Sequence, residues 1–520
     1  MLSLLIFLPI AIALLLIFVP SHSKVFRVAA LGTTLVQLII VVLICNQYLG
    51  ESGAYRLIEK SNWISFSMGE WGVFSSYYWV GLDGMSLPLV VMSVVVFIIA
   101  ALSSWNISHH SKGYFILFLI LNGAIIGTFA AMDTLLFFVF FEFMLIPMYF
   151  LIGIWGGQKR EYASVKFFLF TLLGSIFILI AIIGIYSSAK SPEANTLTHT
   201  FGITHLADSS NFIAGSLLDP SSTQTLGGFT WREWAFLLLF IGFSIKLPVV
   251  PFHTWLPDAH VEAPTPVSIL LAALLLKVGG YGMIRLAYTI FPSEASGFSL
   301  LTGSLALLTI IYGALNAMAC KDLKRLIAYS SVSHMGFVLL GVASGTSEGI
   351  AGSVYQMVSH GLISAMLFAI AGVIFDRTQD RTIANYSGLF AVAPKYTAFV
   401  LLAFFAAMGM PGFSGFIGEI MVFFGSFASH QQNGFLPAWI PIIATLGIIL
   451  TASYYAWTIQ RMFFGKLFIH ENKSITDLTQ REWLILLPLA VLILFFGIYP
   501  QPLLDLINPF AIQLAKLFGH

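Results

Sequence analysis

Residues 233–260 read EWAFLLLFIGFSIKLPVVPFHTWLPDAH. An apolar run long enough to enter a bilayer meets Lys246 and then Pro248 and Pro251. Proline has no amide hydrogen, so each of these residues leaves a carbonyl of the preceding turn without its usual donor. A break in apolar helical sequence beside a charge is typical of membrane proteins in which the break lines a polar cavity. This stretch therefore predicts a discontinuous membrane helix with an ionisable residue at its centre.

The rest of the chain has the same apolar character. Of its 520 residues, 58% are hydrophobic and 9% are charged, whereas about a quarter of the residues in a soluble domain are charged. Since one crossing needs about 20 apolar residues, we expect an all-α polytopic membrane protein, a single membrane domain over 1–520 with about fourteen helices. The predicted spans lie near 2–20, 26–45, 84–104, 114–132, 134–155, 164–187, 233–256, 266–289, 299–318, 325–344, 351–374, 396–428, 437–463 and 483–500.

Charge and cysteine content exclude several classes of function. The formal net charge is +1, so the chain has no basic field for nucleic acid, and nucleic-acid binding is excluded. Cys45 and Cys320 belong to no C-x-x-C pair, and no Gly-rich phosphate loop opens a helix. We therefore expect this chain to bind no cofactor and no metal. Any electron transfer coupled to it takes place in another subunit.

Lysine and arginine are distributed unevenly over the predicted connectors. Connectors after odd-numbered spans contain fourteen of them, and those after even-numbered spans contain five. The fourteen are Lys24, Arg27, Lys112, Lys159, Arg160, Lys321, Lys324, Arg325, Arg377, Arg381, Lys395, Lys466, Lys473 and Arg481, and the five are Arg56, Lys60, Lys190, Arg232 and Lys516. Cytoplasmic loops carry the excess, so we expect the N-terminus outside the cytoplasm. The long connectors 46–83 and 188–232 then lie outside, as surface covers or flexible insertions.

Four ionisable residues lie well inside apolar sequence, namely Glu142, Lys246, Lys277 and Glu419. A charge at the centre of a membrane helix costs about 2.5–3.5 kcal/mol on insertion scales, so each of these residues needs a partner, water or a function. Pro147 interrupts the helix just after Glu142, and Pro411 breaks the helix that carries Glu419. By contrast, three other cations lie near span ends, where we expect their long side chains to reach the headgroups. These are Lys166, Arg285 and Arg461.

The residues leave more than one interpretation of these charges open. Glu142 and Lys246 form either a functional pair or a buried ion pair that only holds helices together. Lys277 has no partner in its own span, and a lysine kept from water releases its proton readily. His334 and His360 lie among serines in successive spans, which fits a hydrated proton path as well as simple packing. A metal site is disfavoured, because these helices offer no third ligand.

Broken helices in both halves of the chain indicate a transport path built from internal repeats. Spans four to eight and nine to thirteen form two units, 114–289 and 299–463, flanked by 1–104 and 483–520. Because each unit has an odd number of helices, the second enters the membrane from the opposite face. We therefore predict two inverted five-helix repeats, with broken helices 7 and 12 each fourth in its unit.

Four motifs carry a resemblance to a known family: IKLPVVPFHTWLPDAHVEAPTPVS, LLLKVGGYG, KDLKRLIAYSSVSHMG and PGFSGFIGE. They resemble the antiporter-like membrane subunits of respiratory complex I, NADH:quinone oxidoreductase, over residues 84–470. The resemblance implies a subunit that moves protons while FMN, iron–sulfur clusters and quinone lie in partner subunits. It also implies L-type and N-type membrane neighbours and lipids as partners, in a bacterial inner membrane. The insertion 188–232 departs from the compact family pattern.

The same resemblance assigns roles to individual residues. The implied proton-translocating residues of helices 5, 7, 8, 10, 11 and 12 are Glu142, Lys246, Lys277, His334, His360 and Glu419. L-type, N-type and large Mrp antiporter subunits usually have lysine at the helix 12 position, whereas M-type subunits, the counterparts of mitochondrial ND subunit 4, have glutamate. Glu419 therefore favours an M-type subunit. The alternatives are a secondary cation/proton antiporter of Mrp type, and a scaffold subunit whose charges only join helices.

Overall fold

The computed structural model of the chain describes residues 1–20, 23–67, 73–192, 198–432, 434–470 and 475–518. Within these ranges, eleven helical segments are long and apolar enough to cross a membrane. They contain α2 (Ser23–Gly50), α3 (Ser86–Ser103), α4 (Ser111–Ala130), α5 (Thr134–Phe143) with α6 (Leu145–Trp155), α7 (Arg160–Ser188), residues 265–288, α14 (Ser299–Ala319), α15 (Leu323–Ala343), α16 (Ser347–Thr378), α19 (Trp439–Phe463) and α20 (Gln480–Ile498). Two shorter apolar helices are α1 (Leu2–Ile17) and α17 (Pro394–Ala407). The predicted all-α polytopic membrane protein is confirmed.

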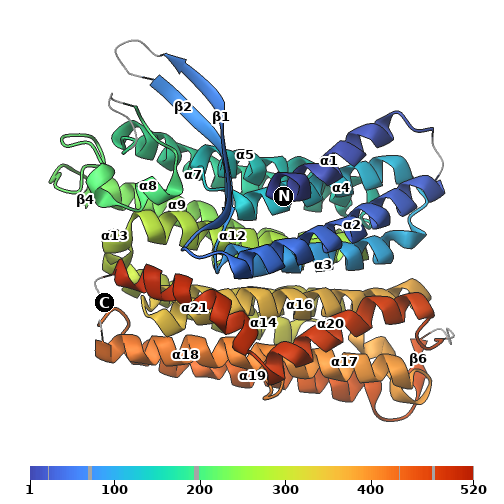
Figure 1. The fold of residues 1–520 in the computed structure, drawn as a ribbon. Helices are drawn as coiled ribbons and strands as arrows, with labels where there is room; N and C mark the ends of the chain where they lie inside the picture. The colour runs from blue at the N-terminus through green and yellow to red at the C-terminus, as the bar shows by residue number, and fades with distance from the viewer. Residues whose placement is uncertain (21–22, 68–72, 193–197, 433, 471–474, 519–520) are drawn as a thin grey trace.

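The helices form one bundle with the N-terminal half on one side and the C-terminal half on the other (Figure 1). Its centre consists of residues 265–288, α15 and α16, which are almost completely buried. The peripheral helices α2, α7 and α19 expose large apolar side chains instead, for example Ile39, Ile183 and Ile449. Such faces suit contact with lipid, whereas the polar residues of the chain's interior are shielded from it.

Two segments leave helical geometry inside the bundle. The first lies between α9 (Trp231–Lys246) and α10 (Trp255–Glu262), and the second lies between α17 and α18 (Ser414–Gln432). Residues 265–288 are helical throughout but contain two wider π-helical turns, at Leu271–Leu275 and Met283–Tyr288. Between these turns lies the α-helical stretch α12 (Leu276–Gly282), which carries Lys277.

In its described residues, 46–67 and 73–83, connector 46–83 forms a β-hairpin and not the flexible insertion that was one of the two alternatives. Strands β1 (Arg56–Ser67) and β2 (Val73–Leu82) pair antiparallel and rise from one end of the bundle (Figure 1). Both strands are rich in aromatic and β-branched residues, as in WISFS and VFSSYYW, which favours strands. Connector 188–232 folds over the same end through α8 (Ile203–Leu206), β3 (Thr225–Leu226) and β4 (Phe229–Thr230), beside α13 (Pro292–Gly297). We refer to this as the hairpin end of the bundle.

The hairpin is attached to the helix that carries Glu142. Asp133 caps the start of α5, and its carboxylate accepts hydrogen bonds from the amides of Leu135 and Leu136, both at 3.0 Å, and of Tyr77 in β2, at 3.1 Å. Burial raises the pKa of Asp133 to about 6, although these hydrogen bonds favour the ionised form. The Asp133 carboxylate thus connects the β-hairpin to α5, the helix that carries Glu142.

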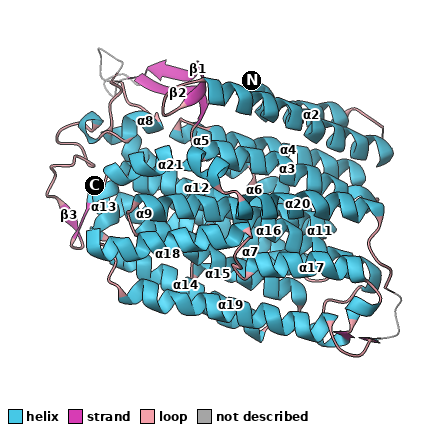
Figure 2. Ribbon diagram, turned by 60° about the horizontal axis from the view of Figure 1, so that its bottom comes forward, coloured by secondary structure: helices cyan, strands magenta, loops and turns pink. Residues whose placement is uncertain are grey.

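The residues after the last predicted span, 483–500, form a further helix, α21 (Gln501–Lys516). Leu503, Ile507, Phe510 and Leu514 follow helical spacing and are buried, while polar residues occupy the other face. The helix packs against α16 (Figure 1), and it adds to the almost entirely helical architecture seen in Figure 2. A short amphipathic helix after a proline is easily missed, because its mean hydropathy is low.

Candidate functional site

Lys246 is the last residue of α9, at the break that the prolines predicted. The amide of Val249 donates to the carbonyl of Ser244 at 2.9 Å. The indole of Trp255, in α10, donates to the carbonyl of Ile245 at 2.8 Å. These bonds stand in for donors that the prolines lack, so the interrupted turn is stable in an apolar interior. The break therefore presents the lysine at the centre of the membrane domain without exposing unpaired carbonyls.

The Lys246 ammonium lies close to Glu142 without binding it. Lys246 is 2% exposed, and its Nζ has no hydrogen-bond partner among the described residues. It lies 3.6 Å from the centre of the Phe141 ring, a cation–π contact that offsets part of the cost of burial. Glu142 is half-buried, and the two charges interact electrostatically although they form no ion pair within the described part of the chain. The expected ion pair between Glu142 and Lys246 is therefore not formed in this structure.

Lys277 obtains its polar surroundings from the π-helical turn that precedes it. Such a turn changes the backbone hydrogen-bonding pattern and is frequent at functional sites. The carbonyl of Ala272, within this turn, accepts a hydrogen bond from Lys277 Nζ at 2.6 Å. The same nitrogen lies 2.7 Å from His360 Nδ1 on α16. Lys277 is completely buried, so its proton can be shared directly with His360.

The path continues from His360 to His334 and Glu419. The imidazole rings of His360 and His334 have centres 5.3 Å apart. His334 Nδ1 lies 3.3 Å from Glu419 Oε1, at ion-pair distance but without hydrogen-bond geometry. All three side chains are nearly buried. The structure thus brings four of the six predicted residues into one row across α12, α16, α15 and α18, and it places Glu142 and Lys246 in a separate group.

The break before α18 makes room for the Glu419 carboxylate. Gly409 has φ +70°, a conformation that side chains other than glycine rarely adopt, and a Cβ added there would overlap Glu419 Oε2. Ser414 opens α18, and its Oγ accepts a hydrogen bond from Ser359 Oγ at 2.8 Å. The break therefore leaves a small polar niche around the carboxylate in otherwise apolar sequence.

Two further buried basic residues, His260 and Lys324, were missed as site residues from the sequence. His260 in α10 is fully buried, and neither ring nitrogen has a hydrogen-bond partner among the described residues. Its ring stacks on Phe368, with centres 4.5 Å apart, and interacts electrostatically with both Lys324 and Lys277. His260 lies within the motif LPDAH, close to the break in the helix after Lys246. That position was the sequence signal that could have identified it as a site residue.

Lys324 was counted among the cytoplasmic connector residues, but its side chain is buried and not exposed. It lies at the start of α15, is 5% exposed, and its Nζ donates to the carbonyl of Ala263. The packing of α15 against α10 buries it, which a count of charges along the sequence cannot detect. Its neighbour Arg325 is exposed and pairs with Asp258 at 3.2 Å, as a connector residue would.

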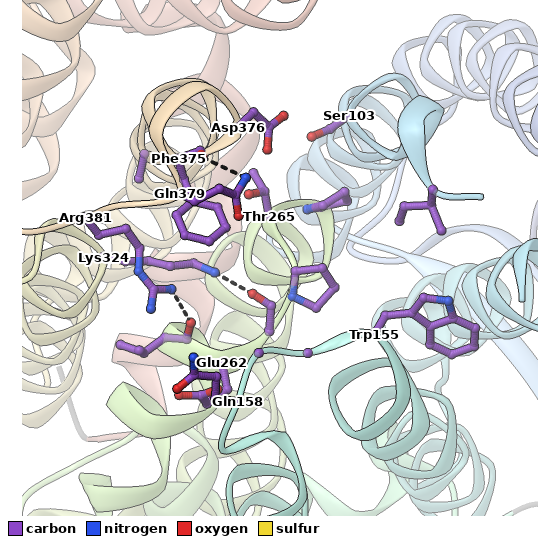
Figure 3. A pocket seen from close by; sticks show the side chains of 18 of the residues that line it. Ser103, Trp155, Gln158, Glu262, Thr265, Lys324, Phe375, Asp376, Gln379 and Arg381 are labelled. Carbon is purple, nitrogen blue, oxygen red and sulfur yellow. Dashed lines mark hydrogen bonds between the residues drawn. The ribbon is translucent and has the colours of Figure 1, made fainter. Parts of the chain in front are cut away.

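A cavity of about 940 Å³ lies beside Lys324 (Figure 3). It lies at the opposite end of the bundle from the hairpin. The helices that line it, such as α3, begin near the hairpin end and finish at the cavity. Lys324 and Arg381 enter it from one side, and Glu262 and Asp376 also line it. One water needs about 15 Å³, so the cavity holds many waters and brings them next to Lys324.

Arg285 does not reach the headgroups, and that prediction is wrong. It is 3% exposed, and its Nη2 lies 2.7 Å from Oδ2 of Asp83, which is in the connector before α3. An acid from a distant connector supplies the partner, and sequence position alone cannot show it. Of the other two cations, Arg461 is exposed, whereas Lys166 forms an ion pair with Asp258 at 2.7 Å.

Fold and site together define a class: a multi-pass integral membrane protein with a row of ionisable side chains buried across the middle of its helical bundle. The family described as NADH:quinone oxidoreductase/Mrp antiporter, TM, matches residues 131–443. The chain belongs to this family, in the group of subunit M and chain 4. The resemblance to M-type subunits is thereby confirmed.

The relatives match over their full length. The chain is 39% identical to NADH-quinone oxidoreductase subunit M of Rhodobacter capsulatus, over 99% of this chain and 96% of the relative. It is 37% identical to NADH-ubiquinone oxidoreductase chain 4 of Chondrus crispus, over 98% and 96%. A chain of respiratory complex I from Thermus thermophilus with bound NADH has a TM-score of 0.83 and 30% identity, with complete coverage of both chains. A chain of the Mrp complex from Dietzia, at 21% identity and TM-score 0.81, covers 99% of this chain and 97% of its own length and shares the fold.

Proposed function

We propose that this chain is the proton-translocating membrane subunit of an NADH:quinone oxidoreductase, equivalent to subunit M. The observation that carries the proposal is the row Lys277, His360, His334 and Glu419, joined by contacts of 2.7 and 3.3 Å and by two imidazoles 5.3 Å apart. Each of these groups can bind and release a proton, and all are shielded from lipid. Ionisable residues kept in a membrane interior at such cost mark ion and proton pathways.

Protons enter the row from the cavity beside Lys324. Glu262 and Asp376 at the cavity collect them from water, and Lys324 and then His260 pass them to Lys277. His260 supports this step because both of its ring nitrogens are unpartnered among the described residues, which leaves them available for transfer. The row then leads to Glu419, from which protons leave towards the other side.

The pair Glu142 and Lys246 acts as the switch that drives transfer. The two charges interact but are not in contact, so a change in a neighbouring subunit can close or open the pair. Closing it alters the electrostatic potential in the bundle and thereby favours proton loss or gain at Lys277. Redox chemistry lies in partner subunits that hold FMN, iron–sulfur clusters and quinone, and L-type and N-type subunits are the expected neighbours.

The topology proposed for this function has fourteen spans, two inverted five-helix repeats and an N-terminus outside the cytoplasm. Helices occur at each predicted range, with α9 and α10 as helix 7 and α17 and α18 as helix 12. The hairpin end then faces outwards and the cavity faces the cytoplasm, as expected for the bacterial inner membrane. This orientation agrees with the Lys and Arg asymmetry.

Single cysteines test the orientation. In a background with Cys45 and Cys320 replaced by serine, Gln379→Cys should react with an impermeant maleimide only from the cytoplasmic side, and Thr223→Cys only from outside. Both positions are exposed, so labelling reports sidedness and not burial. The measurement is mass-tag labelling of right-side-out and inside-out vesicles. Labelling of both cysteines from one face would contradict the fourteen-span topology.

The function itself is tested on the native complex. Purification through a tag on this chain should recover flavin and iron–sulfur absorbance together with NADH-driven quinone reduction. Reconstituted vesicles should then take up protons during turnover. A preparation without flavin that exchanges cations for protons would overturn the proposal in favour of an Mrp-type antiporter.

A further inference from the structure

Lys277 shares one helix face with two polar residues nearer the hairpin end. Tyr281 and Arg285 follow it at spacings of four residues, so the three side chains lie one turn apart on the same face. At 1.5 Å per residue, Arg285 lies about 12 Å beyond Lys277 along the helix. A straight route from Lys277 to the hairpin end would therefore pass Tyr281 and Arg285.

Arg285 is the donor in the hydrogen bonds on both sides of it along this route. The Tyr281 hydroxyl donates to the carbonyl of Phe129 at 2.9 Å and accepts from Arg285 Nε at 3.2 Å. The next Arg285 nitrogens donate to the hydroxyl of Tyr55 at 3.2 Å and contact Asp83 at 2.7 Å. A guanidinium has donors only and stays protonated in proteins, so Arg285 cannot accept a proton from Tyr281. A hydrogen-bonded proton path ends at this residue.

Little space for water lies beside the Arg285 guanidinium. A cavity of about 10 Å³, lined in part by Tyr55, Tyr281 and Arg285, is smaller than the roughly 15 Å³ that one water needs. A larger cavity of about 130 Å³ shares Tyr55 with the small one and is also lined by Phe510 of α21. The Phe510 ring is 5.2 Å from the guanidinium carbon and closes the remaining side. Arg285 and Tyr55 therefore link Tyr281 by hydrogen bonds to the edge of the larger cavity.

We propose that Arg285, held by Asp83, is a proton block that prevents leakage from Lys277 straight to the hairpin end. The inference rests on the proposed function. The guanidinium faces inwards through Nε and so repels a proton approaching from Tyr281, while the Asp83 carboxylate neutralises its charge from another nitrogen. Positive groups that line a pore exclude protons in the same way. Protons on Lys277 then have only the lateral route through His360, which leads to Glu419.

Replacing Arg285 with a side chain that can accept and donate protons should open the route. Arg285→His keeps a partner for Asp83, and vesicles containing the assembled complex should show a rise of about tenfold in passive proton conductance. Arg285→Lys keeps a buried cation and should stay near the wild-type conductance. The measurement is dye-reported proton flux without substrate, under a potassium diffusion potential, normalised to the amount of this chain.

Arg232→His is the matched control. Arg232 pairs with Glu294 at 2.5 Å near the hairpin end and stacks between aromatic rings, but it lies on α9 away from the Lys277 face. This control should not leak. Adding Lys277→Met to Arg285→His should abolish the new conductance, which shows that it runs through Lys277.

Unchanged proton conductance in the assembled Arg285→His variant would overturn the proposal that Arg285 blocks protons. That result would leave open the separate question of whether Lys277 is needed for pumping. If that variant does not assemble, Asp83→Asn with Arg285→Gln gives the neutral alternative, since glutamine carries both a donor and an acceptor. The double variant is expected to leak as well, and a tight double variant would equally overturn the inference.

Discussion

Glu419→Gln is expected to lower substrate-driven proton translocation by about 10²-fold, because glutamine keeps the shape and hydrogen bonding of the carboxylate but cannot carry a proton. In the proposed mechanism, Glu419 receives its proton from His334, which lies 3.3 Å away at the end of the buried row. Glu419→Asp keeps the acid on a shorter arm and should retain part of the activity. The measurement is proton uptake by vesicles during turnover, normalised to assembled complex.

Two further variants separate the carboxylate's chemistry from its packing. Ser414→Ala removes a hydroxyl from the same break without touching the carboxylate, and it should leave pumping within about twofold of wild type. Glu419→Lys places at this position the residue usual in related subunits, and partial activity there would fit a generic proton-loading site. Full pumping by Glu419→Gln would show that Glu419 is structural.

Lys246→Met is expected to lower electron transfer and pumping together by about tenfold or more, with the complex still assembled. Methionine keeps the length of the side chain and its packing on Phe141, and it leaves no unpaired ammonium in the interior. Because Lys246 makes no hydrogen bond within the described residues, its loss should cost little stability. The measurement compares NADH oxidation and proton uptake in the same vesicles.

The matched control is Lys166→Met, which removes a lysine whose partner, Asp258, lies near the surface of the bundle. Partly exposed ion pairs contribute little, so both activities should stay near wild type. If Glu142 and Lys246 only hold helices together, Glu142→Gln with Lys246→Met should pump normally, because the neutral pair leaves neither charge unpaired. Normal pumping by that double variant would contradict the switch.

Most of the helical ranges could be predicted, because a span is a local property of about 20 apolar residues. Proline and glycine positions likewise predicted the breaks beside Lys246 and before Glu419, since the missing amide hydrogen acts on the same turn. The hairpin and α21 were not predicted, because short strands and amphipathic helices give weak hydropathy signals. The roles of the six predicted site residues are still predictions.

Local sequence was sufficient for the membrane class, the ionisable residues in apolar runs and the family, since each depends on neighbours along the chain. Burial and partnership depended on segments far apart in sequence. Arg285 meets Asp83 only because the connector before α3 folds back onto residues 265–288, and Lys324 is buried only because α15 packs on α10. The sequence gives the charge of each side chain, but the electrostatic surroundings of that charge depend on which helices the fold places beside it.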